Sequence, residues 1–446
     1  MSATASIWVA LAVTFLLMSL KRPVWALALY FLTFFAAPSF WWWGDDLPMM
    51  RYALWAGFIL LGAVVIVRPP GTANAPSADK IRTAAIAMAV NAGLVHVMLG
   101  VDRAISLEVL VEFWKYLLLY FLVSAAIKDR ADLHRAIAVI ALGSAYIGWE
   151  VTINERGDFS GSRLEGVGAP AAQTSNSLAN VMLVTLPLAG SLFLQKSWKW
   201  RTVAIVASPL ILNVLLLCNS RGAFLGLIGT GISFVLVSRG KTRKRALQTM
   251  ALASVVLFFL LGDPDIMNRF VTTFTGSEER DTSAASRLTF WQAGFQMLSD
   301  YPLGAGGGAF KFALGSRYLS ALVGVEDADS RSLHNGFMTE ATDWGIQGFL
   351  LKMFAFGVAL SIAYRTAEKC RREERVLDAL LGLCLVTTAI GFLIHCMFGA
   401  FLDHEWGYWI LALLVRYGAL YENAAEAAPA QTTTAIDARA QPVAAA

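Results

Sequence analysis

Long apolar runs, separated by short charged or Gly/Pro-containing breaks, dominate the chain. A helix needs about 20 mainly apolar residues to cross a bilayer. Thirteen runs approach that length, and the eleventh is long enough to begin outside the hydrocarbon. We predict spanning helices at approximately 4–20, 24–40, 52–67, 83–100, 107–126, 136–153, 177–194, 202–218, 222–238, 246–262, 335–364, 376–400 and 405–420.

Composition supports this pattern. Of the 446 residues, 57% are apolar and 15% are charged, against about 45–50% and 25% in soluble globular proteins. Such an apolar excess needs a lipid-facing surface, which excludes an ordinary cytosolic enzyme. The formal net charge of +4 gives no reason to expect a nucleic-acid partner. We predict an all-α polytopic membrane protein with 12 to 13 spans.

The placement of basic residues predicts the topology. Alternate short connections hold 21 Lys and Arg residues, whereas the opposite set of short connections holds 5. Because basic short loops stay on the cytoplasmic side, the N-terminus is predicted to lie outside, with the long loop 263–334 on the outer face. Residues 1–420 are then one multi-span domain whose long loop contains short helices. The Ala-rich tail 421–446 is predicted to be cytoplasmic and disordered.

Several kinds of chemistry find no support in the chain. It has no G-x-x-x-x-G-K-[ST] loop for nucleotide hydrolysis, and no internal repeat of the kind found in inverted-repeat transporters. No His/Asp/Glu set has metal-ligand spacing, so we expect neither a metal nor another cofactor.

Two predicted outer segments, 154–178 and 263–334, carry the candidate chemistry. In the second, Arg287 begins an apolar-faced helix that could lie in the membrane interface, with Ser286 as its N-cap. The glycine run Gly304–Gly308 allows close backbone approach to an anion, but it is equally a plain hinge. On the same side, His395 and the cluster Asp403–Glu405 could line a site.

His334 lies where the long loop meets the eleventh predicted span. A histidine held there by a rigid helix can accept a proton near neutral pH. The alternative is a histidine that caps the helix or bonds a loop carbonyl. Both interpretations remain open from the sequence.

Arg163, Arg221 and Arg287 are all predicted on the outer face. Arg221 lies in a very short connection, CNSRGAF, where a cation is costly unless it meets an anion. Arginine can bind phosphate through two parallel hydrogen bonds. The alternatives are snorkelling to the interface or ion pairs with acidic residues: Glu150, Glu165 or Asp403. Together with His334, the arginines suggest a site for a lipid-linked phosphate.

Four segments carry a family resemblance: SRLEGVGAPAAQTSNSLAN at 162–180, NSRGAFLG at 219–226, SRLTFWQAGFQMLSDYPLGAGGGAF at 286–310 and SLHNGFMTEATDWGIQG at 332–348. In order and placement they resemble the O-antigen ligase and polymerase superfamily of bacterial membrane glycosyltransferases. The resemblance covers most of residues 20–420 and implies a GT-C-like architecture of many helices.

The resemblance also implies an activity and roles. Members move a glycan from undecaprenyl diphosphate to an acceptor hydroxyl on the periplasmic side of the inner membrane, by inverting, metal-independent transfer. Arg163 and Arg221 match the arginines that bind the donor diphosphate, Arg287 matches the loop-helix arginine, and His334 matches the histidine that deprotonates the acceptor. The supporting candidates are Asn176, Glu340, Asp343 and Asp403.

The expected partners are therefore the undecaprenyl-diphosphate-linked saccharide, membrane lipids and an acceptor. The acceptor remains open among lipid A-core, another glycan and a protein hydroxyl. A ligase is slightly favoured over a polysaccharide polymerase or a protein O-oligosaccharyltransferase. A lipid-linked oligosaccharide transporter is the alternative from another class.

Overall fold

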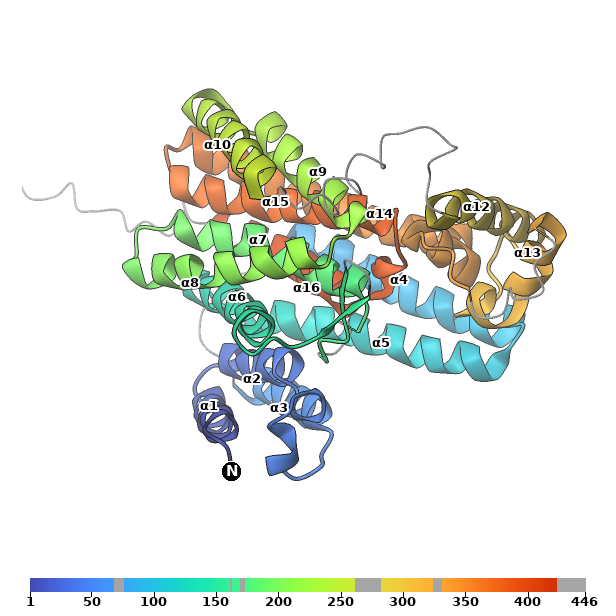
Figure 1. Cartoon of the computed structure of the whole chain (residues 1–446), viewed down its shortest axis with the longest axis horizontal. Helices are drawn as coiled ribbons and strands as arrows, with labels where there is room; N and C mark the ends of the chain where they lie inside the picture. Colours follow the sequence, from blue (N-terminus) through green and yellow to red (C-terminus); the bar gives the residue numbers. More distant parts are fainter. Residues whose placement is uncertain (68–75, 161–162, 169–172, 261–281, 324–330, 423–446) are drawn as a thin grey trace, which may run out of the picture.

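The computed structural model describes residues 1–67, 76–160, 163–168, 173–260, 282–323 and 331–422. In these residues, each of the thirteen predicted spans coincides with a helix (Figure 1). The fold class, an all-α polytopic membrane protein, is confirmed. The helices are α1 (Ala3–Ser19), α2 (Pro23–Phe35), α3 (Tyr52–Ile66), α4 (Pro76–Leu99), α5 (Arg103–Ala126), α6 (Arg130–Ile153), α7 (Ser175–Phe193), α8 (Trp198–Leu217), α9 (Arg221–Val237), α10 (Gly240–Leu260), α14 (Gly336–Arg372), α15 (Val376–Cys396) and α16 (Glu405–Glu422).

Length and hydropathy place eleven of these thirteen helices in two groups. Among the described residues, eight candidate spans are long and apolar enough to cross a membrane, and α1, α3 and α9 are shorter apolar helices. The four cysteines are free and buried, as expected for small core residues. The predicted tail, 421–446, lies outside the described residues from 423 onward.

The basic connections gather at one end of the bundle, which we call the basic end. There, Arg22 pairs with Asp129 and, at 3.1 Å, with Asp132. Arg130 Nη1 lies 3.4 Å from Asp378 Oδ2, which joins the α5–α6 and α14–α15 connections. Connections that the charge pattern assigns to one side of the membrane therefore meet in space.

The opposite end carries the shorter elements and is called the hairpin end. A two-stranded hairpin follows α6, formed by β1 (Asp158–Ser160) and β2 (Arg163–Glu165), with Ser160 opposite Arg163. Short 3₁₀ helices η1 (Pro38–Phe40) and η2 (Gly44–Asp46) follow α2, and η4 (Phe401–Asp403) precedes α16.

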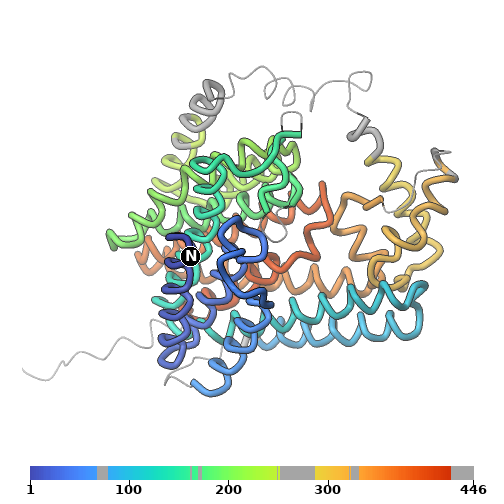
Figure 2. Tube along the Cα trace, turned by 60° about the horizontal axis from the view of Figure 1, so that its bottom comes forward, coloured from blue at the N-terminus to red at the C-terminus, as the bar shows by residue number. Residues whose placement is uncertain are grey.

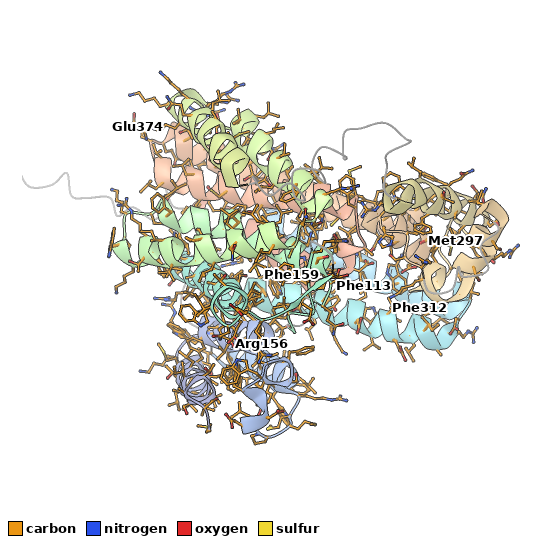
Figure 3. All side chains as sticks on the ribbon, in the orientation of Figure 1. Phe113, Arg156, Phe159, Met297, Phe312 and Glu374 are labelled. Carbon is orange, nitrogen blue, oxygen red and sulfur yellow. The ribbon has the colours of Figure 1, made fainter. Side chains whose placement is uncertain are left out.

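The long loop folds into a small helical unit, which we call the loop unit. It contains α12 (Thr282–Asp300), the π-helical turn η3 (Phe310–Leu314) and α13 (Gly315–Val323). The unit lies beside the ends of α4 and α5 in both views (Figures 1 and 2). In Figure 3, Met297 marks this unit and Glu374 the far, basic end. Its own apolar core includes Ala293, Met297, Phe310, Leu319 and Leu333.

A break in α14 holds the loop unit against the bundle. Gly345 adopts φ 82°, so the helix is kinked there and nearby backbone groups lose their helical partners. The loop unit supplies them: Ala305 N–H donates to Thr342 O and Gly306 N–H donates to Asp343 O, each at 3.0 Å. In return, Ile346 N–H donates to Pro302 O at 3.0 Å.

A buried ion cluster lies just beyond this kink. Lys352, 2% exposed, donates to Glu340 and, at 3.3 Å, to Asp403 Oδ1. Its ammonium also lies 4.9 Å from the centre of the Phe113 ring. Glu340 and Lys352 lie on opposite sides of the kink, and Asp403 lies in η4. The ion pairs therefore link both halves of α14 to η4.

We predict that Lys352→Met destabilises the protein strongly, because Glu340 is left as an unpaired buried carboxylate or must take up a proton. Loss of one member of a buried pair costs about 3–5 kcal/mol. Thermal unfolding in detergent measures the effect. Lys115→Met is the matched control, since Lys115 is exposed on α5. An equal loss of stability in both variants would contradict this role.

Candidate functional site

The hairpin presents Arg163 to the first turn of α7. Arg163 Nη2 donates to Asn176 Oδ1 at 2.7 Å. Asn176 is fixed because α7 begins at the preceding residue, where Thr174 Oγ1 caps the helix by accepting from Ser177 N–H at 3.3 Å. The hairpin therefore sets the position of this arginine.

The same asparagine joins α7 to the start of α9. Ser220 caps α9 by accepting from Ala223 N–H at 3.4 Å, and its hydroxyl donates to Asn176 Oδ1 at 2.8 Å. Arg221 is the first residue of α9. Asn176 thus places Arg163 and Arg221 beside each other, at the meeting point of two helix N-termini.

Arg287 reaches this cluster from α12. The helix packs closely on the segment before α14, since a Cβ at Gly294 would lie 2.7 Å from Met338 Cε and 2.8 Å from Leu333 Cδ2. The pKa of Arg287 is lowered by burial and then by the nearby charges of Arg163 and Arg221. Arg287 therefore lies within electrostatic range of both Arg163 and Arg221, and the role predicted for the three arginines stays a prediction.

His334 lies next to Arg287. Its ring centre is 5.9 Å from that of Phe290, one turn along α12 from Arg287. The pKa of His334 is lowered from its usual value by burial, by Arg287 and by Arg331. The imidazole is therefore neutral at pH 7 and able to accept a proton.

The helix-capping alternative for His334 is wrong, because the next residue caps α14. Asn335 Oδ1 accepts from Phe337 N–H at 3.0 Å and from Met338 N–H at 3.2 Å. The backbone of His334 is left-handed, with φ 50°, and its N–H donates to Ser332 Oγ at 3.2 Å. The cap of α14 therefore does not use the His334 side chain.

The supporting candidates divide into two groups. Asn176 contacts the arginine cluster directly. Glu340 and Asp403 bind Lys352 instead, and Asp343 Oδ2 accepts from Gly308 N–H at 2.9 Å. These three carboxylates therefore have structural partners of their own.

The glycine run is a packed turn and not an anion cradle. In addition to Gly308, Gly306 N–H donates to Asp343 O at 3.0 Å and Gly307 N–H to Ser106 Oγ at 3.1 Å. Glycine is required at 304, where φ is 95° and a Cβ would lie 2.6 Å from Gly345 N. The N–H groups that would bind phosphate are already used within the protein.

A network of polar side chains contacts the first turn of α9, next to Arg221. A Cβ at Gly222 would lie 3.2 Å from His395 Nε2, so the start of α9 rests directly on His395. His395 Nδ1 is 2.7 Å from Asn180 Nδ2, and Asn180 Oδ1 accepts from Trp406 Nε1. The sequence suggested that His395 could line the site, but it did not predict the hydrogen bonds among His395, Asn180 and Trp406. Ser220 was also missed, although a serine just before an apolar run is a recognisable N-cap signal.

In the parts of the chain that the structure covers, no group of three or more His, Cys, Asp or Glu residues is arranged to hold a metal ion. The fold and the site together define a multi-pass membrane protein with an arginine cluster and a neutral histidine at the hairpin end.

The O-antigen ligase family model matches residues 206–353, a segment that includes Arg221, Arg287 and His334. No curated protein matches the chain significantly. The matched segment contains three of the four motif segments, 219–226, 286–310 and 332–348, and agrees with the resemblance that they carry. Over these residues the chain is similar to the O-antigen ligase family.

We predict that inorganic diphosphate raises the melting temperature of the protein in detergent by a few degrees, because an anion relieves the repulsion among three cations. Arg221→Lys should weaken this stabilisation, since lysine cannot make two parallel bonds to phosphate. Arg103→Lys, at an exposed position on α5, is the control. Equal stabilisation of both variants would remove Arg221 from the anion site.

Proposed function

We propose that the protein transfers a glycan from undecaprenyl diphosphate to an acceptor hydroxyl at the periplasmic face of the bacterial inner membrane. The transfer is O-antigen ligase-like, inverting and independent of metal. One observation carries the proposal: His334, whose pKa is lowered by burial and by Arg287, lies near an arginine whose pKa is lowered by burial and by the charges of Arg163 and Arg221.

The arginine cluster suits the leaving group. When the bond between the anomeric carbon and the diphosphate oxygen breaks, the electron pair leaves with that oxygen. Arg163, Arg221 and Arg287 would stabilise the charge that develops there. The N-termini of α7 and α9 add partial positive charge at the same point. The guanidinium groups would thereby supply the electrostatic stabilisation that a metal ion provides in metal-dependent transferases.

His334 suits the role of general base. It would take the proton from the acceptor hydroxyl as the oxygen attacks the anomeric carbon on the side opposite the diphosphate. A new carbon–oxygen bond forms as the bond to diphosphate breaks, so the configuration inverts. The lowered pKa keeps the imidazole neutral, as this step requires.

The periplasmic placement rests on charge. The basic end carries the Lys- and Arg-rich short connections and is assigned to the cytoplasm by the positive-inside rule. The site at the hairpin end then faces the periplasm, where the loop unit covers it.

A ligase is slightly favoured, and a polymerase or a protein O-oligosaccharyltransferase would use the same chemistry on another acceptor. A transporter is less well supported. The buried cation Lys352 is paired with Glu340 and Asp403, which does not suit a polar path through the membrane.

His334→Ala should abolish product while the protein remains in the membrane, because the general base is lost. The measurement is mass spectrometry of surface glycans from a deletion strain complemented with the variant, together with the lipid-linked precursor, which should accumulate. His134→Ala is the control, since His134 lies at the basic end and contacts Arg130 O at 2.7 Å. Unchanged glycan output from the His334 variant would remove the general-base role.

The pH dependence of transfer should depend on Arg287. In the wild type, activity falls as the pH drops through the lowered pKa of His334, since the protonated ring cannot act as a base. Arg287→Gln removes a nearby positive charge, so the pKa of His334 rises and the acid limb of the rate profile moves to higher pH.

The matched control is Arg317→Gln, at an exposed position on α13. It should leave the acid limb in place, whatever its effect on the overall rate. An acid limb that stays put in the Arg287 variant as well would show that another group limits the reaction at low pH.

A further inference from the structure

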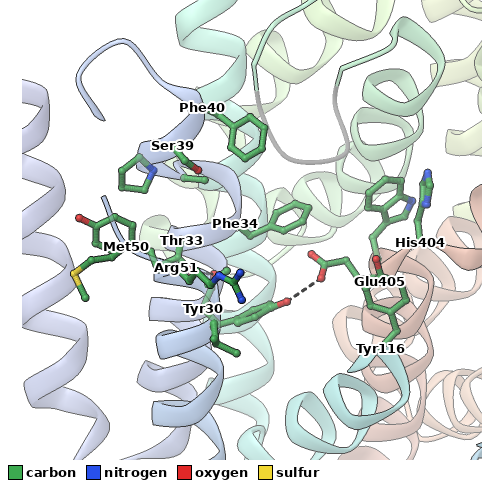
Figure 4. A pocket seen from close by; sticks show the side chains of 16 residues that line it. Tyr30, Thr33, Phe34, Ser39, Phe40, Met50, Arg51, Tyr116, His404 and Glu405 are labelled. Atoms are coloured by element: carbon green, nitrogen blue, oxygen red, sulfur yellow. Dashed lines mark hydrogen bonds between the residues drawn. The ribbon is translucent and has the colours of Figure 1, made fainter. Parts of the chain in front are cut away.

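A cavity that the proposed mechanism does not use lies between α2, α3, α5 and the start of α16 (Figure 4). Its volume is about 490 Å³, within the range of about 300–1,000 Å³ that is usual for small-molecule sites. The described residues that line it combine aromatic rings with a few polar groups. This composition is typical of a binding site and not of a packing defect.

Glu405 provides the main polar group of the cavity. It is 9% exposed, and Tyr30 Oη donates to its Oε2 at 2.8 Å across the cavity (Figure 4). Its other oxygen, Oε1, is buried and has no hydrogen-bond partner within the described part of the chain. A buried acceptor without a partner is unfavourable by about 1–3 kcal/mol. A ligand that donates a hydrogen bond to Glu405 Oε1 would therefore be favoured in this cavity.

The residues that line the cavity indicate which kind of hydrogen-bond donor fits. Phe34, Tyr116 and Trp406 line it, as does Arg51, which directly precedes α3 (Figure 4). A sugar ring fits this lining, because its C–H faces pack on aromatic rings while its hydroxyls bond to a carboxylate. A lipid tail does not fit, because it would leave the buried carboxylate oxygen unsatisfied.

Two links join the cavity to the arginine cluster. Trp406 lines the cavity and donates through Nε1 to Asn180, which contacts His395 directly beneath Gly222. On the other side, a Cβ at Gly168, shortly after the strand that carries Arg163, would lie 2.8 Å from Phe40 O at the cavity edge. These contacts connect the cavity to the helix that begins with Arg221 and to the segment that follows the strand of Arg163.

We propose that this cavity binds a sugar ring of one of the two transfer substrates, with Glu405 accepting a hydrogen bond from a ring hydroxyl. The ring belongs either to the glycan on the donor or to the saccharide of the acceptor. The inference rests on the proposed glycan transfer.

The test is steady-state transfer by the full-length protein in liposomes, with undecaprenyl-diphosphate-linked glycan as donor and lipid A-core as acceptor. Glu405→Gln keeps an acceptor for Tyr30 but replaces the free carboxylate oxygen. Loss of this hydrogen bond should raise KM for one substrate roughly threefold to tenfold, with kcat little changed. The substrate whose KM rises identifies the source of the sugar.

Two further variants make the result decisive. Tyr116→Phe removes a second polar group from the cavity and should raise the KM of the same substrate by a smaller factor, which tests the site even if the Glu405 variant does not fold. Glu108→Gln, at an exposed position on α5, should leave both KM values unchanged.

The outcomes separate the two levels of the proposal. If Glu405→Gln and Tyr116→Phe behave as wild type, or lower kcat with both KM values unchanged, the sugar-binding assignment is overturned. If the wild type makes no product, or His334→Ala is fully active in the same assay, the proposed transfer itself fails, and the assignment that rests on it falls too.

Discussion

The break in α14 at Gly345 is the constraint on which the arrangement of the site depends. A helix that stops inside the protein exposes carbonyl and N–H groups that must find partners. The loop unit provides them through the backbone of Pro302, Ala305 and Gly306, so the loop cannot take another position without leaving buried polar groups unpaired. Asn91 Nδ2 adds a bond to Trp344 O at 2.8 Å, which ties the break to α4 as well. Arg287 lies in the loop unit and His334 directly precedes α14, so the contacts at this break help to fix the positions of both residues.

The site is then built from two halves that meet. The bundle contributes Arg163 and Arg221, which Asn176 holds through hydrogen bonds to the hairpin and to the cap of α9. The loop unit and the segment that follows it contribute Arg287 and His334. Burial and the charges of Arg163 and Arg221 together lower the pKa of Arg287. Three arginines within electrostatic range of one another favour an anionic ligand, and Arg287 also contributes, after burial, to the lowered pKa of His334.

The sequence predicted the helices, which the membrane requires, and missed the contacts between residues that are far apart along the chain. Every predicted span became a helix because an apolar segment in lipid must satisfy its own backbone. The sequence singled out the arginines and His334 because a cation or a titrating ring at a span end is unfavourable unless it has a partner or a function, and their roles stay predictions. Glu340 and Asp403 were predicted to support the site, yet both bind Lys352, 12 and 51 residues away along the chain. The hairpin was not predicted, although Phe159 and Leu164 alternate with polar residues around Gly161-Ser162, which is a two-residue hairpin signal.

Backbone strain marks the same positions as the chemistry. Among the described residues, four that are not glycine have positive φ: Glu155, Asn219, His334 and Glu374. Two of them stand just before helix caps at the proposed site, since Asn219 precedes the cap of α9 and His334 precedes the cap of α14. A left-handed residue at this position turns the chain sharply into the helix, and it is unfavourable by about 1–2 kcal/mol outside glycine. Asparagine and histidine are both found in this conformation more often than most other residues that are not glycine. A left-handed residue at a candidate site supports a hypothesis of function, and His334 combines this backbone with its position near Arg287.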